Sequence, residues 1–431
     1  MDFYSTLEPR LGKELAEALR SSRKLPVVHG LYRNENKLSE EALFAAFPSL
    51  KKHPLVPNAY YYEEGQYEPG KHLYHHLGGY YLMDTASMLP PYLLAPKVGE
   101  RILDLCAAPG GKTCLMALMA PSSPILSNDL SYPRSLITSQ NVERLGLDNV
   151  VVTAGDFAKA KDHYQAYFDA ILLDAPCSGS AMFRKDVRLE EDWTAAKRDK
   201  LCVIQKELLD LAATLLAPDG RIVYSTCSFS YEEDEAIILD FLSSHSDFHP
   251  VKPRDCSLLY SHPDLPEGIR ALPDRFPGEG QFACLLVRDG EGNFSAKAKP
   301  TKLDAESQRI LAQYGLSHFD GLRVKDDVYA LPRPMLVSGL SLLRYGVKVG
   351  SFEKGRFLPD HHLAVAGHMK KVSLSLPQTL AFLQGEGFPL DASDGEVSLT
   401  YDQFDLGYAK IVKGYAKNHY PKGLRRKFEG I

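Results

Sequence analysis

From about residue 100 onward, short apolar runs alternate with longer stretches in which apolar residues recur at helical spacing. The runs that predict strands are 101–107, 124–128, 150–153, 168–173 and 221–226. The stretches that predict helices are 136–145, 193–216 and 232–242. Because strands that alternate with helices pair in parallel, this part of the chain is predicted to be an α/β domain.

Two further apolar runs, 268–272 and 282–288, are separated by the turn signal Pro277-Gly278-Glu279-Gly280. They are predicted to pair antiparallel and to close one edge of the sheet. An earlier turn signal, Pro218-Asp219-Gly220, is expected to end the preceding helix and to start the next strand.

The pattern differs on both sides of this domain. The N-terminal part has an amphipathic stretch (1–19) predicted to be a helix, an extended segment (25–32) and a tyrosine-rich stretch (60–81). Residues 289–305 read as a linker, and strands are predicted at 324–331 and 338–343. We therefore expect an N-terminal α+β accessory region (1–95), a central α/β domain (96–290) and two small C-terminal domains (306–365 and 370–431).

Charge is distributed unevenly along the 431 residues, although the net charge is only −5. Residues 297–431 hold 20 Lys/Arg against 14 Asp/Glu, whereas the remainder holds 30 against 41. A basic module joined to a more acidic domain indicates a nucleic-acid partner. No apolar run approaches about eighteen residues, so no membrane span is expected.

The seven cysteines contain no C-x-x-C pair, which argues against a disulfide framework or a structural zinc site. Free thiols suit a reducing compartment, so the chain is expected to be cytoplasmic. His72, His75 and His76 form a small cluster, but no Cys or acidic partner stands near them in the sequence. No bound metal is therefore predicted.

The first predicted strand runs into the loop Asp104-Leu105-Cys106-Ala107-Ala108-Pro109-Gly110-Gly111-Lys112-Thr113, which opens a helix. Small residues let backbone approach a ligand, and a helix N-terminus offers free N–H groups and positive potential. The loop lacks the G-x-G-x-x-G pattern of dinucleotide sites and the full spacing of NTPase phosphate loops. It suits instead the carboxylate and sugar of an amino-acid nucleoside.

Acidic residues follow the next two predicted strands. Asp129 ends the second, where a carboxylate can accept hydrogen bonds from ribose hydroxyls. After the third, Asp156 could bind an adenine amino group and Phe157 could flank the ring. Each residue alone is equally well explained as a turn residue or helix cap, but their order at successive strand ends favours a nucleoside pocket.

Cysteines follow the fourth and fifth predicted strands, as Asp174-Ala175-Pro176-Cys177-Ser178-Gly179 and Ser225-Thr226-Cys227-Ser228. One buried cysteine is usually a core residue, but two at strand ends beside a nucleoside pocket favour chemistry. A thiolate that adds to carbon 6 of cytosine makes carbon 5 nucleophilic toward a sulfonium methyl group. A second group then helps to remove the carbon-5 proton, and Asp174 is placed to assist at ring nitrogen N3.

The segments DLCAAPGGKT, NDLSYPR, GDF, DAPCSGSAMFRKD and STCSFSYEEDE together resemble the Sun-type RNA (cytosine-5) methyltransferases over residues 75–290. The resemblance implies a Rossmann-like class I methyltransferase core that uses S-adenosylmethionine. It implies that Cys227 is the nucleophile, that Cys177 aids product release and that Asp174 contacts the base. The implied cofactor contacts are Cys106, Ala107, Ala108, Pro109, Gly110, Gly111, Lys112, Asp129, Arg134, Asp156 and Asp174.

The chain departs from the family pattern at two places. Ser180-Ala181 stands where the family usually has Glu-Gly after its Pro-Cys element, and Met83-Asp84-Thr85 stands where a Gln is common. Just beyond the first departure, Arg184 and Lys185 are expected either along the RNA phosphates or in the active site.

The segment 406–428 carries seven Lys/Arg and no Asp/Glu, interleaved with Tyr408, Tyr415 and Tyr420. Basic groups neutralise phosphates and aromatic rings stack on unpaired bases, although a merely solvated basic face is the alternative. This segment resembles a PUA-like RNA-binding domain, and 346–364 resembles the domain that precedes it in bacterial family members acting on small-subunit ribosomal RNA. The predicted RNA contacts are Arg184, Lys185, Lys410, Lys413, Lys417, Lys422, Arg425 and Arg426.

These observations predict a monomeric enzyme that methylates carbon 5 of cytosine in ribosomal RNA, near the decoding region of the small subunit. The ribosomal target rests on the resemblance alone. A transfer-RNA cytosine methyltransferase would carry the same motifs and is the first alternative. An RNA-binding assembly factor without turnover is the second, but such a protein would have no need of both thiols.

Overall fold

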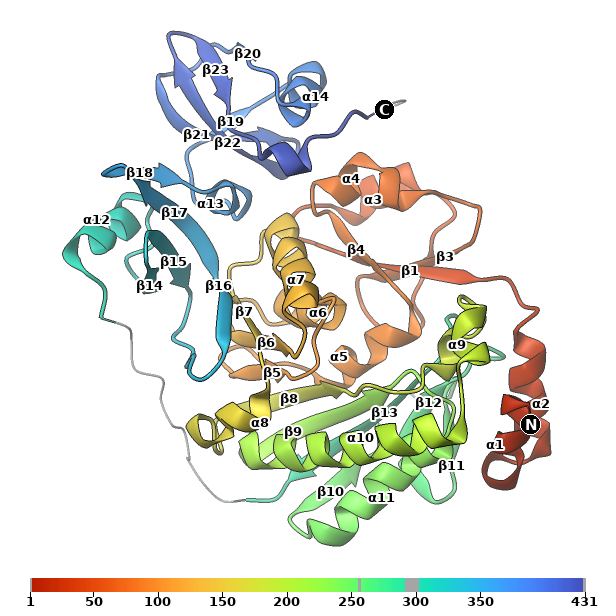
Figure 1. Cartoon of the computed structure of the whole chain (residues 1–431). Coiled ribbons are helices and arrows are strands. Elements are labelled where there is room, and N and C mark those ends of the chain that lie inside the picture. The colour runs from red at the N-terminus through yellow and green to blue at the C-terminus, as the bar shows by residue number, and fades with distance from the viewer. Residues whose placement is uncertain (1, 255–256, 291–301, 429–431) are drawn as a thin grey trace.

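The computed structural model describes residues 2–254, 257–290 and 302–428. In these residues the strands form four sheets, the largest with ten strands, and additional modules lie at both ends of the chain (Figure 1). The predicted α/β core with an N-terminal region and small C-terminal modules is confirmed. Residues 291–301 of the predicted linker lie outside the described residues.

Five parallel strands form the centre of the large sheet in the order β9-β8-β5-β6-β7. Their bounds are β5 (Ile102–Asp104), β6 (Ile125–Asp129), β7 (Val150–Ala154), β8 (Phe168–Asp174) and β9 (Leu216–Thr226). All five coincide with predicted runs. The turn predicted to start the last strand lies inside β9 as a bulge, since Phe168 pairs with Leu216 but Ala170 pairs with Arg221.

Helices cover this sheet and connect its strands. They are α5 (Leu89–Leu94), α6 (Gly111–Met119), α7 (Tyr132–Leu145), α8 (Phe157–Ala160), α9 (Val187–Glu191), α10 (Ala195–Leu215) and α11 (Glu235–Ser244). The local sequence explains the two longest. Thr194 caps the start of α10 by accepting from the Lys197 N–H, and Gly146 ends α7 in the left-handed conformation.

One edge of the sheet is antiparallel and contains β10 (Phe248–Val251), β11 (Tyr260–His262), β12 (Leu265–Ala271) and β13 (Gln281–Arg288). The predicted pair, β12 and β13, forms as expected, and β13 joins it to β9. This pair does not close the edge, however, because β11 lies outside β12.

The opposite edge is completed by β16 (Ser341–Tyr345), which pairs antiparallel with β7. This strand comes from the predicted first C-terminal domain, so that domain shares a sheet with the core. Arg344 on β16 donates a hydrogen bond to Ser139 Oγ on α7 at 2.9 Å and pairs with Glu143 on the same helix.

The N-terminal region begins with α1 (Phe3–Leu11) and α2 (Lys13–Ser22), where one helix was predicted. Gly12, at φ +83°, separates them. A four-stranded sheet follows in the order β2-β3-β1-β4. Its elements are β1 (Val28–Arg33), α3 (Glu40–Ala46), β2 (Lys51–Lys52), β3 (Ala59–Glu63), α4 (Leu73–His76) and β4 (Tyr80–Met83).

Two small sheets form the C-terminal part. The first uses α12 (Ala305–Gln313), β14 (Asp320–Val324), β15 (Asp327–Leu331), β17 (Val347–Glu353), β18 (Arg356–Pro359) and α13 (His361–Val365). The second uses β19 (Lys371–Ser373), α14 (Leu376–Gln384), β20 (Phe388–Pro389), β21 (Gly395–Tyr401), β22 (Phe404–Val412) and β23 (Tyr415–Asn418). The strand predicted at 324–331 is therefore a hairpin turn followed by β15.

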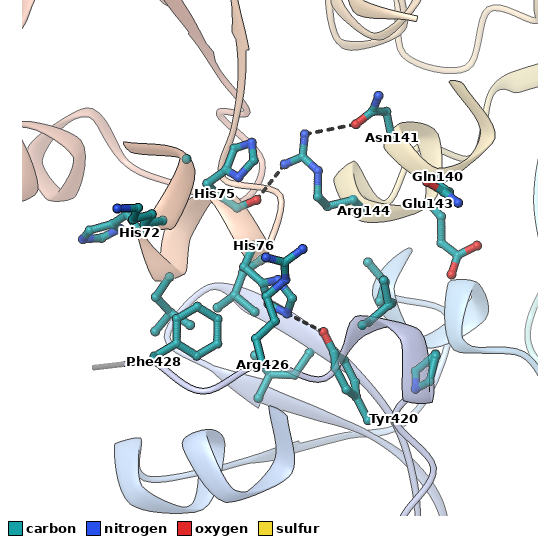
Figure 2. Close-up of a pocket in the computed structure, with 18 of the residues that line it drawn as sticks. His72, His75, His76, Gln140, Asn141, Glu143, Arg144, Tyr420, Arg426 and Phe428 are labelled. Atoms are coloured by element: carbon teal, nitrogen blue, oxygen red, sulfur yellow. Dashed lines mark hydrogen bonds between the residues drawn. The ribbon is translucent and has the colours of Figure 1, made fainter. Parts of the chain in front are cut away.

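The first and last parts of the chain meet across the end of α7 (Figure 2). His76 Nε2 lies 2.7 Å from the hydroxyl of Tyr420, and the Phe428 ring packs edge-on against the His76 ring. Arg144 of α7 donates to the backbone carbonyl of His75 at 2.6 Å. The tail is thus held against both the N-terminal region and the core.

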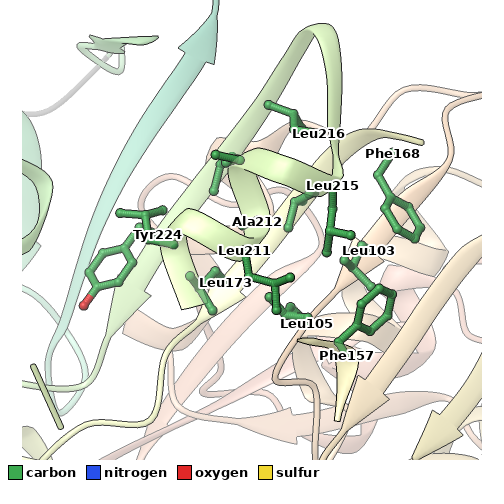
Figure 3. Packing of buried hydrophobic residues seen from close by; sticks show 14 of the residues in the cluster. Leu103, Leu105, Phe157, Phe168, Leu173, Leu211, Ala212, Leu215, Leu216 and Tyr224 are labelled. Carbon is green, nitrogen blue, oxygen red and sulfur yellow. The ribbon is translucent and has the colours of Figure 1, made fainter. Parts of the chain in front are cut away.

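The core between α10 and the sheet is apolar (Figure 3). Leu211, Ala212 and Leu215 of α10 pack over Leu103 and Leu173 of the parallel strands. This packing fixes the strands, and therefore the loops at their carboxyl ends, as one rigid edge. In the ranges that the structure describes, no helix is long and apolar enough to cross a membrane.

Candidate active site

The loops that follow β5 to β9 meet at one edge of the sheet, as strand ends in parallel sheets must. The loop after β5 is held from the neighbouring strand end. The Ala107 N–H donates to Asn128 O at 2.9 Å, and the Ala108 N–H donates to Asp129 Oδ2 at 3.2 Å. Asn141 of α7 donates to Pro109 O at 3.2 Å. The predicted cofactor loop is therefore shaped before any ligand binds.

Gly110 and Gly111 lead from this loop into α6. A Cβ on Gly110 would meet Thr138 of α7 at 2.6 Å, and φ at this position is +95°. Glycine is therefore needed here for the close packing of α6 and α7 as well as for the open N-terminus.

Lys112 lies at the first turn of α6 and its ammonium contacts Asp174 Oδ2 at 2.7 Å. Burial alone would lower the pKa of Lys112, but the charge and hydrogen bond of Asp174 outweigh it and raise that pKa. Lys112 thus joins the predicted cofactor loop to the predicted base-contacting carboxylate.

Two side chains that were not predicted hold the other oxygen of Asp174. Ser225 Oγ donates to Oδ1 at 2.7 Å and Gln281 Nε2 donates to it at 3.0 Å. Ser225 belongs to β9, Gln281 to β13 and Asp174 itself to β8, so side chains from three strands meet at this carboxylate. About 30% of the Asp174 side chain remains exposed, which leaves it accessible to a base.

The two predicted reactive thiols lie together, with Cys177 Sγ 3.3 Å from Cys227 Sγ. Both are partly buried. The hydrogen bond with Cys227, followed by burial, raises the pKa of Cys177 well above its usual value. Cys177 therefore keeps its proton at neutral pH and can donate it toward the Cys227 sulfur.

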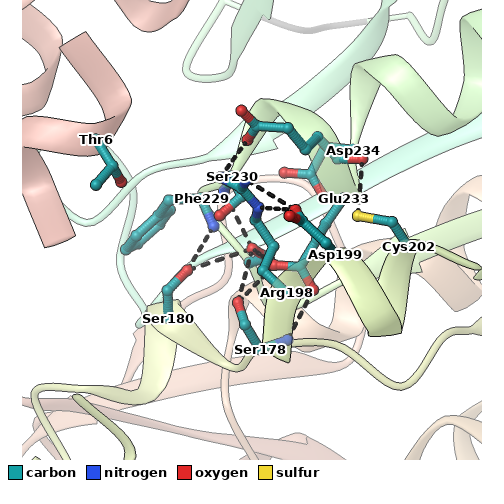
Figure 4. Close-up of polar contacts among 12 residues, drawn as sticks. Thr6, Ser178, Ser180, Arg198, Asp199, Cys202, Phe229, Ser230, Glu233 and Asp234 are labelled. Carbon is teal, nitrogen blue, oxygen red and sulfur yellow. Dashed lines mark hydrogen bonds and ion pairs between the residues drawn. The ribbon is translucent and has the colours of Figure 1, made fainter. Parts of the chain in front are cut away.

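Glu233 ties together the two loops that carry these thiols (Figure 4). Its carboxylate accepts from the Ser178 N–H at 2.8 Å, from Ser178 Oγ at 2.5 Å and from Ser228 Oγ at 2.6 Å. Gln205 of α10 donates to it at 3.1 Å. Glu233 is fully buried and was not predicted as a site residue, although it lies in the quoted STCSFSYEEDE segment.

The Ser180-Ala181 pair, where the chain departs from the family pattern, stabilises the same region. Ser180 Oγ accepts from the Phe229 N–H at 2.8 Å, and the Ala181 N–H donates to Cys227 O at 3.1 Å. One contact through the Ser180 side chain and one through the backbone of Ala181 therefore link the Cys177 and Cys227 loops.

The predicted nucleoside contacts lie in order along the strand ends. Asp129 is buried at the end of β6, with Arg134 at 3.4 Å. Asp156 accepts from the Ala158 N–H and so caps α8, while about 41% of its side chain stays exposed. The prediction that Phe157 flanks the adenine ring is wrong. Its ring is buried in the core against Tyr164, so it cannot flank a bound base.

The structure also contradicts the predicted RNA contact of Arg184, because all five of its N–H groups donate hydrogen bonds within the protein. Two form a bidentate pair with the buried Glu279, and the others reach the carbonyls of Ser22, Leu25 and Gly278. It stabilises the fold and is not free to bind phosphate. Lys185 lies 3.6 Å from Asp84 and 3.5 Å from Glu279.

The predicted basic residues of the tail are exposed: Lys410, Lys413, Lys417, Lys422, Arg425 and Arg426. The interleaved tyrosines behave differently from the prediction. Tyr408 lies in the apolar cluster of the first C-terminal domain and Tyr420 packs against His76 of the N-terminal region, so they are only 5% and 4% exposed, whereas Tyr415 is 45% exposed. Two of the three rings are therefore unavailable for stacking on RNA.

No group of three His, Cys, Asp or Glu side chains within the described ranges is arranged to hold a metal ion. The six cysteines in those ranges are free, and Cys256 lies outside them.

Comparison with known proteins identifies the family. Residues 91–287 match the family described as 16S rRNA methyltransferase RsmB/F. Residues 311–366 match the RsmF rRNA methyltransferase first C-terminal domain, and 369–426 match the methyltransferase RsmF PUA domain. Over 407 residues the chain is 30% identical to ribosomal RNA small subunit methyltransferase F of Serratia proteamaculans, covering 88% of this chain and 85% of that relative. The chain belongs to the RsmF methyltransferase family.

A second RsmF relative, from Shewanella sediminis, is 30% identical over 83% of this chain and 81% of its own length. Among solved structures, a methyltransferase homologue from Pyrococcus horikoshii aligns with a TM-score of 0.57 and 26% identity, covering 65% of this chain and 92% of that one. NSun6 from Pyrococcus horikoshii with SFG has a TM-score of 0.60, covers 67% of this chain and 98% of that one, and at 20% identity shares the fold. The predicted family is confirmed, and the chain is a methyltransferase.

Proposed function

We propose that this RsmF family member transfers a methyl group from S-adenosylmethionine to carbon 5 of a cytosine in small-subunit ribosomal RNA, with Cys227 as the nucleophile. The observation that carries the proposal is the pair of thiols, 3.3 Å apart, at the strand ends beside Asp174. The relatives are named as ribosomal RNA small subunit methyltransferases, which supports the substrate class.

The strand-end loops fit an amino-acid nucleoside. Oδ1 of Asp104 is buried and has no hydrogen-bond partner among the described residues, so a ligand amino group would satisfy it. Asp129 is placed for ribose hydroxyls and Asp156 for an adenine amino group, with Arg134 beside them. When bound, S-adenosylmethionine supplies an electrophilic sulfonium methyl group.

We place Leu130, and not Phe157, beside the adenine as its apolar neighbour. It directly follows Asp129 and is 77% exposed, whereas Phe157 is buried in the core. We place the other predicted cofactor contacts in the loop after β5 and at the start of α6: Cys106, Ala107, Ala108, Pro109, Gly110, Gly111 and Lys112.

The reaction begins when the Cys227 thiolate adds to carbon 6 of cytosine. The sulfur–carbon bond forms, and the electrons of the carbon 5–carbon 6 double bond become available for carbon 5 to bond the methyl group. Asp174, held by Lys112, Ser225 and Gln281, lies at the N3 edge, where a proton shared between the carboxyl group and N3 neutralises the negative charge that the addition places on the ring.

The same addition prepares Cys177 for its role. Its raised pKa arises first from the hydrogen bond with Cys227, and this cause disappears once the Cys227 sulfur is bonded to carbon 6. Cys177, released from that hydrogen bond, then assists the transfer of the carbon-5 proton to solvent, which leaves the electrons of the carbon–hydrogen bond on carbon 5. Those electrons restore the double bond, and the Cys227 thiolate leaves.

Trapping the intermediate tests this assignment. Cys177→Ala is expected to accumulate a covalent protein–RNA adduct, seen as a slower band on a denaturing gel. Cys227→Ala is expected to abolish both the adduct and methyl transfer, while binding of S-adenosylmethionine persists. Methyl transfer by Cys227→Ala would contradict the mechanism.

Bisulfite sequencing of RNA from a deletion strain tests the substrate. We expect one or more methylated cytosines to be lost from small-subunit ribosomal RNA. Loss from transfer RNA alone would reject the ribosomal assignment and leave the chemistry intact.

We further propose that the enzyme acts as a monomer in the cytoplasm on ribosomal RNA or a small-subunit particle. The exposed Lys410, Lys413, Lys417, Lys422, Arg425 and Arg426 support an RNA-binding tail. We keep 96–290 as the methyltransferase domain, 1–95 as the accessory region, and 306–365 and 370–431 as the C-terminal domains, with β16 donated to the core sheet.

A further inference from the structure

A cleft of about 960 Å³ lies where the N-terminal region, α7 and the C-terminal tail meet (Figure 2). Its lining comes from residues 47–77, 140–144, 361–365 and 405–428, which are far apart in the sequence. It includes none of the thiols or strand-end residues described above, so the proposed chemistry does not use it.

The cleft carries an excess of positive charge. Each acidic group in its lining already has an ion-pair partner: Glu68 with Lys71, Glu143 with Arg344, and Asp405 with Lys371. Three lining cations, Arg144, Arg426 and Lys427, have no ion-pair partner among the described residues. A low-dielectric recess with uncompensated cations favours an anionic ligand.

Aromatic rings line the same cleft. Phe428 and His76 pack with their ring centroids 5.2 Å apart (Figure 2), and His75 also lines the cleft. Burial, followed by the charge of neighbouring arginines, lowers the pKa of both histidines to about 4, so their rings are uncharged at neutral pH. Flat neutral rings beside cations suit a nucleobase joined to a phosphate.

We propose that this cleft binds an unpaired nucleotide of the RNA substrate, with its phosphate at Arg426 and Lys427 and its base against Phe428 and His76. The identity of the ligand as RNA rests on the proposed function. Paired RNA is not expected to bind in the cleft, because its bases are stacked within the helix and cannot enter a recess.

The cleft also adjoins the cofactor loop. Asn141 lines the cleft and donates to Pro109 O, while Arg144, one turn further along α7, donates to the carbonyls of His75 and Tyr80. One helix therefore separates the bound nucleotide from the methyl-transfer site. RNA held here would be anchored at a second point while its target cytosine reaches Cys227.

Binding of a single-stranded RNA 12-mer, measured by fluorescence anisotropy over a series of salt concentrations, tests the proposal. Arg426→Ala and Phe428→Ala are each expected to weaken binding about tenfold. Arg426→Ala should also reduce the slope of log affinity against log salt by about 0.7, the loss of one phosphate contact on a single strand. Lys370→Ala is the matched control, since it removes an exposed cation of the C-terminal part that does not line the cleft.

Photocrosslinking locates the contact directly. A 12-mer carrying 4-thiouridine is expected to crosslink to peptides containing His76 or Phe428. Lys427→Ala, at an exposed position, gives a second binding test should Phe428→Ala lower the melting temperature. Unchanged binding by the Arg426 and Lys427 variants, with crosslinks found only elsewhere, would overturn the proposal.

Failure here is distinguishable from failure of the proposed function. If the wild type methylates RNA and the cleft variants keep its KM for RNA, only the cleft proposal is wrong. If the wild type binds the 12-mer through the cleft and does not methylate cytosine, only the proposed activity is wrong.

Discussion

Glu233 contributes no reacting atom, yet its buried carboxylate accepts hydrogen bonds from Ser178 beside Cys177 and from Ser228 beside Cys227. It therefore sets the distance between the two thiols. Glu233→Gln places an amide NH₂ against groups that donate hydrogen, which separates the loops. Since a misplacement of about 1 Å can cost about 100-fold in rate, we expect kcat to fall by that order.

Single-turnover methylation and the rate of Cys227 alkylation by iodoacetamide measure this effect. The affinity for S-adenosylmethionine should be unchanged, because Glu233 does not touch the cofactor loop. Asp199→Asn, which changes an exposed acid on α10, is the control. Wild-type kcat in Glu233→Gln would refute the positioning role.

Lys37 is a residue whose charge opposes folding. Its ammonium is buried without a hydrogen-bond partner among the described residues, and burial lowers its pKa to about 8. That value already includes the opposing effect of Asp405 and the smaller lowering effects of Arg144 and Lys371. Below pH 8 both folded and unfolded chains hold the proton, so the folded state carries the full cost of about 3 kcal/mol.

Lys37→Met is therefore expected to raise the free energy of unfolding at pH 7 by up to about 3 kcal/mol. Between pH 8 and about 10.5 the unfolded wild type binds the extra proton, so wild-type stability rises with pH and the advantage of the variant shrinks. Urea unfolding at pH 7 and pH 9.5 measures this difference. A constant advantage at both pH values would contradict the assignment, and Lys370→Met should show no advantage at either.

Of the site residues, those that follow strands were predictable because a parallel sheet brings successive strand ends to one edge. Cys177, Cys227 and Asp174 could be placed in this way. Gln281 and Glu233 could not, since one reaches Asp174 from an antiparallel strand and the other binds two loops at once. Arg184 was misassigned because a basic residue in a loop looks the same whether Glu279 or a phosphate neutralises it.

At the scale of elements, β16 joins the C-terminal part to the core through Arg344. This buried side chain pairs with Glu143 of α7, hydrogen-bonds Ser139 and contacts His362. Arg344→Ala leaves Glu143 without its partner and removes these hydrogen bonds. We expect a loss of about 3 kcal/mol in the free energy of unfolding.

Urea unfolding followed by circular dichroism tests this prediction. Lys206→Ala, which breaks the exposed pair with Asp240 on α11, is the control and should leave the midpoint unchanged. Equal midpoints for the Arg344 and Lys206 variants would show that β16 contributes little to the core.

The parallel strands could be predicted because each is a short apolar run buried on both faces. The partner of β16 could not, because a run such as Ser341-Leu342-Leu343-Arg344-Tyr345 fits any half-buried edge. The N-terminal helix was predicted too long, since the periodicity continues through Gly12 although the backbone turns there. Patterns along the chain thus identify elements better than they identify neighbours.

At the scale of the whole molecule, the uneven charge correctly indicated a basic C-terminal module. The cleft that we propose as its RNA-binding surface was not predictable, because His76 and Phe428 are separated by 352 positions and meet only in the folded chain. The cleft exists only while the N-terminal region, the core and the C-terminal tail are packed together. RNA binding and overall folding are therefore expected to be lost together on heating.

The pairing of β16 with β7 has a consequence for synthesis of the chain. Ala154 pairs with Ser341, so the β7 edge must wait for about 190 further residues to be translated before it is covered. At about 5–20 residues per second, that edge stays open on the ribosome for roughly 10–40 s. An open strand edge can recruit another chain, so we expect nascent copies of this methyltransferase to be more exposed to unwanted strand pairing during that interval than a core closed by its own sequence would be.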